Sequence, residues 1–160
     1  MAAKSLFVIG AGKIGRAYTG RLFSRYGYRI DYVDILPDLV SALNGQGQHT
    51  VRLVTNTSQE DVLVAPVTCI SSADVELTAE LIVNSTLGAT SVGARALPEI
   101  APVIARGIEL RATRQVQAPL NIVLCENLYG APTILRDLVI ANLAPSALGY
   151  MQDKVGFVET

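Results

Sequence analysis

The chain has 160 residues, 50% of them hydrophobic and 17% charged, with a net charge of −1 at pH 7. This length suits one domain with a substantial core, and a near-neutral charge without a basic stripe argues against nucleic acid as the main partner. No apolar run reaches the roughly 18 residues of a membrane span, and the N-terminus lacks a signal-peptide layout. Cys69 and Cys125 lack metal-ligand spacing, so we expect no metal site and reduced thiols in a cytoplasmic protein.

The sequence Ser5 to Tyr18, SLFVIGAGKIGRAY, predicts a strand, a tight turn and the start of a helix. The apolar run Leu6 to Ile9 is followed by glycines spaced G-x-G-x-x-G, which allow the turn, a close approach of a pyrophosphate and close helix packing. The start of the helix presents free N–H groups and its positive dipole end to the phosphates. The cofactor-binding residues predicted in this turn are Gly10, Ala11, Gly12, Lys13, Ile14 and Gly15.

The next segments complete a predicted βαβ unit. An apolar helical stripe comprises Ile14, Ala17, Tyr18, Leu22 and Tyr26. The strand Tyr28 to Val33 then ends in Asp34, which lies 19 residues after Gly15, where a carboxylate accepts hydrogen bonds from the adenosine ribose. Ile35 follows instead of a basic residue, which favours NAD over NADP. The alternative is a glycine turn that serves packing only, with a solvated Asp34.

A short helix and an inserted hairpin are predicted next. Pro37 opens a helix over Leu36 to Leu43, and His49 follows in a loop, where we expect its side chain to be exposed. Thr50 to Val54 and Val62 to Val67 are rich in β-branched residues and predict the two strands of a β-hairpin, with Pro66 at an edge.

The α/β alternation then returns. A short helix over Asp74 to Ala79 and an apolar strand Leu81 to Val83 are predicted, followed by the polar loop Asn84 to Gly88. Because ligands bind at the carboxyl ends of parallel strands, Thr86 in this loop is predicted to contact the cofactor. The alternative is a turn that caps the following helix.

The remaining segments predict a helix Leu97 to Arg111, a strand Leu120 to Cys125, a helix Ala131 to Leu143 and a closing strand Val155 to Thr160. Glu126 and Asn127 follow a buried strand and need polar partners, so Asn127 is predicted on the nicotinamide side of a cofactor; both residues could equally cap the next helix. These elements predict an α/β fold: a Rossmann-type, doubly wound, mainly parallel sheet with an inserted β-hairpin.

Four segments, in this order and spacing, carry a resemblance to a known family. They are the glycine turn at 10–16, Val33-Asp34, LNIVLCEN at 120–127 and VGFV at 155–158. Together they resemble the N-terminal half of enzymes of the mannitol dehydrogenase family of long-chain polyol dehydrogenases. The glycine spacing is shared by many nucleotide-binding families, whereas its combination with the C-E-N and G-F-V segments is specific.

The resemblance implies a Rossmann domain that binds NAD and, in the complete enzyme, reversible oxidation of mannitol 1-phosphate to fructose 6-phosphate. The family's catalytic lysine and its asparagine and histidine partners lie on a mainly helical C-terminal domain, which we expect to be absent from this chain. Lys4, Lys13, Lys154 and His49 lie in no motif that would make them proton-transfer bases. We therefore expect residues 1–160 to be the dinucleotide-binding domain, without catalytic residues, and to bind NAD(H) without turnover.

One residue departs from the family, and one alternative function stays open. Lys13 stands where the family commonly has asparagine; it either meets the cofactor phosphate or is solvated. A stand-alone NAD(H)-sensing regulatory module, similar to the Rossmann domains of potassium transport systems, also has an acidic residue after its second strand. The C-E-N and G-F-V segments favour the dehydrogenase.

Overall fold

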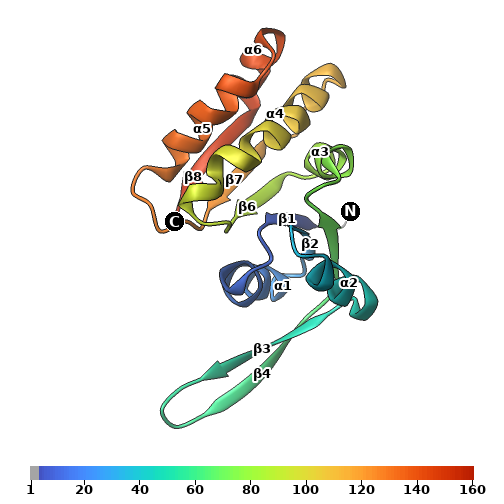
Figure 1. Ribbon diagram of the computed structural model, residues 1–160, viewed down its shortest axis with the longest axis vertical. Coiled ribbons are helices and arrows are strands. Elements are labelled where there is room, and N and C mark those ends of the chain that lie inside the picture. Colours follow the sequence, from blue (N-terminus) through green and yellow to red (C-terminus); the bar gives the residue numbers. More distant parts are fainter. Residues whose placement is uncertain (1–3) are drawn as a thin grey trace.

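One parallel sheet organises the molecule. The computed structural model describes residues 4–160, and its main sheet has six parallel strands in the order β5-β2-β1-β6-β7-β8 (Figure 1). The strands are β1 Ser5–Ile9, β2 Arg29–Asp34, β5 Val67–Ser71, β6 Leu87–Thr90, β7 Leu120–Leu124 and β8 Val155–Glu159. The chain order reverses between β1 and β6, which creates the switch point where doubly wound folds bind ligands. The predicted Rossmann-type fold is confirmed.

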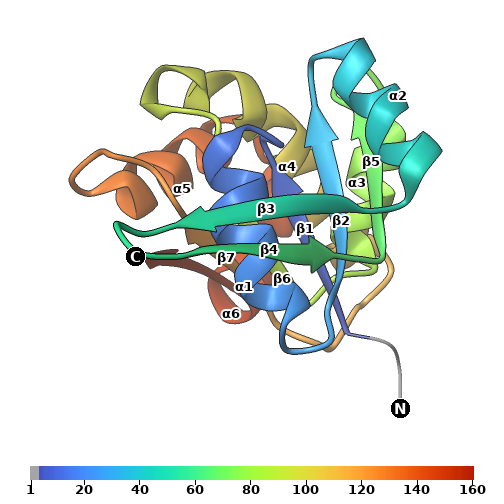
Figure 2. The same ribbon diagram turned by 90° about the horizontal axis from the view of Figure 1, so that it is seen from below.

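Helices cover both faces of this sheet (Figures 1 and 2). They are α1 Arg21–Ser24, α2 Pro37–Gln46, α3 Val75–Val83, α4 Leu97–Thr113, α5 Ala131–Asn142 and α6 Leu148–Lys154, with short 3₁₀ turns at Ala94–Ala96 and Pro145–Ala147. The strand β1 is apolar from Leu6 to Ile9 because its two faces meet different cores. Leu6 and Val8 pack on the side of α2, whereas Phe7 and Ile9 pack on the side of α3, α4 and α5. None of the helices in residues 4–160 has the length and apolar character that crossing a bilayer requires.

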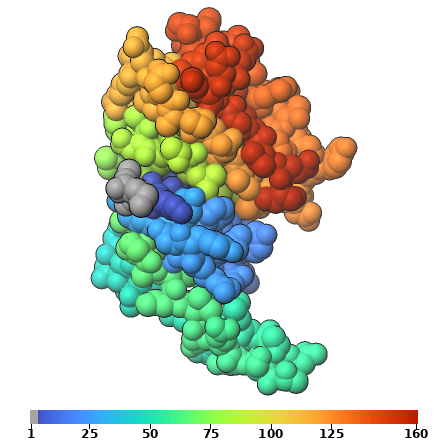
Figure 3. All heavy atoms as spheres, turned by 180° about the vertical axis from the view of Figure 1, so that it is seen from behind, coloured from blue at the N-terminus to red at the C-terminus, as the bar shows by residue number. Residues whose placement is uncertain are grey.

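The inserted hairpin is confirmed, with a different second strand. β3 His49–Val54 and β4 Gln59–Val64 form their own antiparallel sheet, which projects from the body of the molecule (Figures 1 and 3). The predicted strand Val62 to Val67 is wrong, because Val67 already begins the edge strand β5 of the main sheet, after Pro66. The prediction thus treats the end of β4 and the start of β5 as one strand, although Ala65 and Pro66 separate them.

The predicted strand Leu81 to Val83 is also wrong. These residues end α3, which begins after Asp74, whose side chain accepts a hydrogen bond of 3.1 Å from the backbone N–H of Leu77. Ile82 and Val83 are buried on the helix, and a short apolar run alone does not distinguish a buried strand from a buried helix. The true strand is β6, and the sequence prediction also missed α6.

His49 does not lie in an exposed loop. It begins β3 and is half-buried, and its Nε2 shares a hydrogen bond of 2.9 Å with the hydroxyl of the fully buried Tyr32 on β2. Burial, with a smaller contribution from the Arg16 guanidinium, lowers the pKa of His49 to about 4. The single histidine therefore joins the base of the hairpin to the sheet.

Candidate cofactor-binding site

The glycine turn follows β1, as predicted, and its three glycines differ in their surroundings. Gly10 has φ of +98°, and a Cβ there would lie 2.5 Å from the carbonyl oxygen of Ser91. A Cβ on Gly15 would lie 2.0 Å from the carbonyl oxygen of Gly10, so helix and turn touch there. A Cβ on Gly12 would meet nothing within 4 Å. Gly12 thus exposes bare main chain on the open side of the turn, as a pyrophosphate would require.

Asp34 lies next to this turn, at the end of β2. Its carboxylate accepts a hydrogen bond of 2.8 Å from the backbone N–H of Ala11 and another of 3.0 Å from the backbone N–H of Leu36. The side chain therefore ties the loop after β1 to the loop after β2. Each carboxylate oxygen has lone pairs left to accept bonds from a ligand hydroxyl.

The helix that follows the turn has an unusual start. It is π-type over Gly15–Gly20 before it becomes α1, and Arg16 donates a hydrogen bond to the carbonyl oxygen of Ala11. π-type turns occur frequently at functional sites. The predicted apolar stripe does not face the core: Ile14, Tyr18 and Tyr26 are 52%, 50% and 69% exposed. The buried side of this π-type turn consists of Gly15, Thr19 and Gly20, because the helix packs closely on the sheet there.

A cavity of about 300 Å³ opens beside the turn and Asp34. It lies between the carboxyl ends of β1 and β2 and the first turn of α4. Its lining is mainly apolar and comprises Ile9, Gly10, Gly12, Val33, Asp34, Ile35, Leu36, Ser72, Ser91, Val92, Ala96, Glu99 and Ile100. An apolar cavity with a few convergent polar groups is the usual form of a site for a small ligand.

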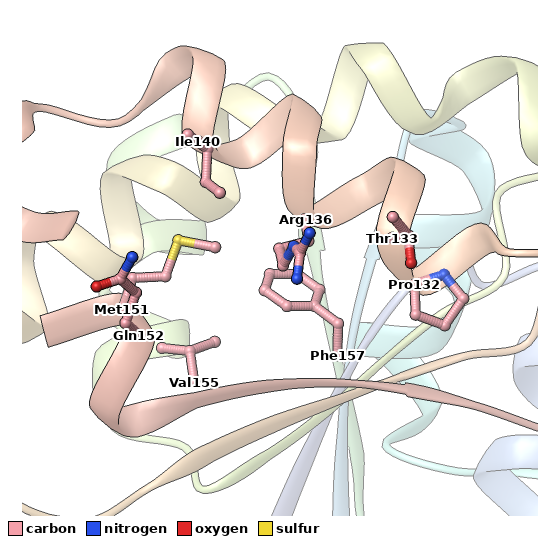
Figure 4. A pocket seen from close by; sticks show the side chains of 8 residues that line it. All are labelled: Pro132, Thr133, Arg136, Ile140, Met151, Gln152, Val155 and Phe157. Carbon is pink, nitrogen blue, oxygen red and sulfur yellow. The ribbon is translucent and has the colours of Figure 1, made fainter. Parts of the chain in front are cut away.

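A larger cavity, about 500 Å³, lies elsewhere, between α5, α6 and β8 (Figure 4). Arg136 is among the residues that line it, and it is paired with Asp137 at 3.1 Å. This cavity contains no glycine turn and no carboxylate, so it lacks the groups that recognise a dinucleotide. The smaller cavity is therefore the candidate cofactor site, because it combines the glycine turn with a carboxylate.

Thr86 is not brought to this site. It precedes β6, and the carbonyl oxygen of Thr86 accepts a hydrogen bond from the N–H of Asn121 at the start of β7, so Thr86 lies at the amino end of the sheet. The prediction puts Thr86 at a carboxyl end because it places the strand before Thr86, whereas β6 begins after it. Asn127 follows β7 at the carboxyl end, on the same edge as Gly10, and its side chain is exposed.

Sequence reasoning missed the loop Ser91 to Gly93, which follows β6. The Ser91 hydroxyl donates a hydrogen bond of 2.7 Å to the carbonyl oxygen of Gly10. The Glu126 carboxylate accepts bonds of 3.0 and 2.8 Å from the backbone N–H groups of Val92 and Gly93. The partners of Glu126 are thus backbone groups of a neighbouring loop. A correct position for β6 would have indicated this loop, because strand ends mark the ligand edge.

The two cysteines have different surroundings. Burial, with a smaller contribution from the charge of Asp34, raises the pKa of the Cys69 thiol to about 11. Cys69 therefore stays protonated at neutral pH and is not a nucleophile there. The hydroxyl of Thr19, on the π-type turn, donates to Cys125 Sγ at 3.4 Å, which joins the end of β7 to that turn.

Known proteins resemble this chain over most of its length. Two curated mannitol-1-phosphate 5-dehydrogenases, from Brevibacillus brevis and Enterococcus faecalis, are 38% and 34% identical to it over 92% of the chain. The chain spans 38% of the length of each of these relatives.

Solved structures share the fold. An octopine dehydrogenase with NADH and L-arginine superposes with a TM-score of 0.66 at 18% identity, over 96% of this chain and 34% of its own. Galactitol-1-phosphate dehydrogenase from Escherichia coli superposes with a TM-score of 0.55 at 14% identity, over 99% of this chain and 36% of its own.

The family model described as the mannitol dehydrogenase Rossmann domain matches residues 4–160. This range contains every element that builds the cavity, the glycine turn and Asp34. The comparisons and the geometry agree that this is a nucleotide-binding domain of an oxidoreductase. The chain belongs to the mannitol dehydrogenase family, as its Rossmann domain.

Proposed function

We propose that this chain binds NAD(H) for a polyol-phosphate dehydrogenase that interconverts mannitol 1-phosphate and fructose 6-phosphate. The observation that carries the proposal is the position of the Asp34 carboxylate, which is held beside the glycine turn by the N–H of Ala11. A dinucleotide would place its pyrophosphate on the bare main chain at Gly12 and its adenosine ribose against Asp34. Lys13, exposed in the first helical turn, would add a charge to the phosphate site.

The same carboxylate supports NAD as the cofactor in preference to NADP. A 2′-phosphate would lie next to Asp34 and be repelled by it, whereas a 2′-hydroxyl donates a hydrogen bond to it. Ile35, the next residue, is 74% exposed and offers no charge to a phosphate. Of the residues lining the cavity, none is lysine or arginine.

The polyol chemistry is proposed for a longer protein. NAD, when bound, supplies the hydride acceptor, and Asn127 lies on the edge of the sheet where the nicotinamide would lie. The curated relatives are longer than this chain, and we propose that the groups that bind the polyol and move its proton come from a C-terminal domain. The isolated chain is then expected to bind cofactor without turnover.

The free thiols Cys69 and Cys125 support a cytoplasmic location.

Calorimetric titration of the 160-residue chain with NADH and NADPH tests this proposal. We expect NADH to bind at least about tenfold more tightly than NADPH. Asp34→Ala should weaken NADH binding and remove the preference for NADH over NADPH. Asp153→Asn removes the same negative charge at an exposed position on α6, and it should alter neither the affinity nor the preference. Equal affinity for NADH and NADPH in the unmodified chain would contradict the cofactor assignment. Protein-dependent production of NADH from mannitol 1-phosphate would contradict the claim that catalytic groups are missing.

A further inference from the structure

A second carboxylate, Glu99, lines the cavity that Asp34 lines. Glu99 lies in the first turn of α4, and it borders both the 300 Å³ cavity and an adjoining cavity of about 160 Å³. Four other residues line both cavities: Ile9, Val33, Ser72 and Ile100. Glu99 therefore stands where the larger cavity meets the smaller one, which reaches neither Gly12 nor Asp34.

The other polar groups of the cavity are largely committed to the protein. Its polar side chains belong to Asp34, Ser72, Ser91 and Glu99. The Asp34 carboxylate already accepts two backbone N–H bonds, and the Ser91 hydroxyl donates to Gly10. Within residues 4–160, the side chains of Ser72 and Glu99 make no hydrogen bond. These two are the groups left to recognise a ligand on this side.

The geometry of the proposed function decides which part of the ligand meets Glu99. With the pyrophosphate at Gly12 and the ribose at Asp34, the base attached to that ribose enters the space beyond Asp34. Ile35 and Ile100 give that space apolar walls, which suit the faces of a flat ring. The polar edge of the ring then points to the end of the cavity where Glu99 and Ser72 lie.

We propose that Glu99 is a specificity-determining residue that selects adenine as the base, by accepting a hydrogen bond from its 6-amino group. This inference rests on the proposed binding of a dinucleotide. A carboxylate can only accept hydrogen bonds. The 6-amino group of adenine is a donor. Hypoxanthine and guanine carry a carbonyl oxygen at this position, which is an acceptor and is repelled.

A pair of cofactors that differ at this one position tests the proposal. The 160-residue chain is titrated by calorimetry with NADH and with reduced nicotinamide hypoxanthine dinucleotide. We expect NADH to bind about tenfold more tightly, which is the size of one hydrogen bond gained against one repelled in a partly exposed site. In Glu99→Gln the side-chain amide donates to a carbonyl as well as it accepts from an amine, so the two affinities should agree within about threefold.

The ratio of two affinities in one protein does not change if a variant is merely less stable, because both ligands report on the same folded fraction. Asp153→Asn is the matched control and should keep the tenfold ratio of the unmodified chain. A ratio near one in the unmodified chain, or a ratio that Glu99→Gln leaves unchanged, would overturn the role of Glu99 while the proposed function stands. Failure of both dinucleotides to bind the folded chain would overturn the proposed function and this inference together.

Discussion

The Asp34 carboxylate and the backbone N–H of Ala11 are joined by a hydrogen bond of 2.8 Å. The residue proposed to hold the ribose thus also holds the turn proposed to hold the pyrophosphate. Leu36 donates a second backbone bond of 3.0 Å to the same carboxylate. Asp34 is therefore oriented before any ligand arrives, and such pre-organisation lowers the entropic cost of binding.

The glycines at 12 and 15 should separate binding from folding. Gly12→Ala adds a methyl group where nothing lies within 4 Å, so we expect an unchanged melting temperature but at least about tenfold weaker NADH binding. Gly15→Ala places its methyl 2.0 Å from the carbonyl oxygen of Gly10, and we expect it to cost about 2–3 kcal/mol of stability. Thermal melts and calorimetric titrations of both variants check this. Tight NADH binding by a folded Gly12→Ala protein would show that the pyrophosphate lies elsewhere.

Glu126 should act on the cofactor through the loop that it holds. Glu126→Ala leaves the N–H groups of Val92 and Gly93 without their acceptor. We expect this variant to lose about 1–2 kcal/mol of folding stability and to bind NADH more weakly. Glu126→Gln retains one acceptor oxygen, so its stability and affinity should fall between those of the unmodified chain and Glu126→Ala. Hydrogen exchange at the two amides measures the loop directly. Unchanged exchange in Glu126→Ala would mean that the loop is held by other contacts.

Folding stability should decrease as the pH falls from about 6.5 to about 4. Burial lowers the pKa of His49 to about 4 in the folded chain, against 6.5 when unfolded. Between these values the unfolded state binds a proton that the folded state does not, so stability rises with pH. Because His49 is only half-buried, we expect the free energy of unfolding to change by about 1–2 kcal/mol over this pH range. Urea denaturation at several pH values measures this change, and His49→Gln should make stability nearly independent of pH there. An equally steep pH dependence in that variant would show that other groups cause it.

Arg111 should be essential for stability although it lies outside the cofactor cavity. Its guanidinium is fully buried and donates to the carbonyl oxygens of Ile82, Val83, Ser85 and Ala118. Arg111→Met leaves these acceptors without a donor, and we expect a loss of about 3 kcal/mol or more in urea denaturation.

Arg136→Met serves as the control for Arg111, because Arg136 is exposed and is paired with the neighbouring, exposed Asp137. We expect this control to change stability by about 0.5 kcal/mol at most. If Arg111→Met proved as stable as Arg136→Met, the carbonyl contacts would contribute little. Arg111→Lys, which keeps the charge but only one donor group, should recover part of the loss.

The sequence predicted the elements in which a local signal and a tertiary role coincide. The run Leu6 to Ile9 is apolar on both faces, which is typical of a central parallel strand, and the structure places β1 in the centre of the sheet. Asp34 could be identified because its distance from the turn is set by the length of one helix and one strand. The helix that begins at Leu97 was also predicted correctly.

The predictions from the sequence were wrong where the local pattern fits more than one structure. Leu81 to Val83 reads as a strand, but its burial on α3 comes from contact with α4, which no local pattern shows. The same error explains why Thr86 was predicted at the carboxyl end of a strand, although it lies at the amino end of β6. His49 looked like a loop residue because its partner, Tyr32, lies on another strand.

By itself, the sequence determined the class of the fold, the glycine turn and the acidic residue that accompanies it, because these depend on residue types at fixed spacing along the chain. Tertiary structure alone decided which strand ends meet at the cavity, how Ser91 and Glu126 hold the loops around it, and that Glu99 lines it. Those relationships join residues distant in sequence, and hydrogen bonds and burial between distant segments leave no periodic signal in the chain.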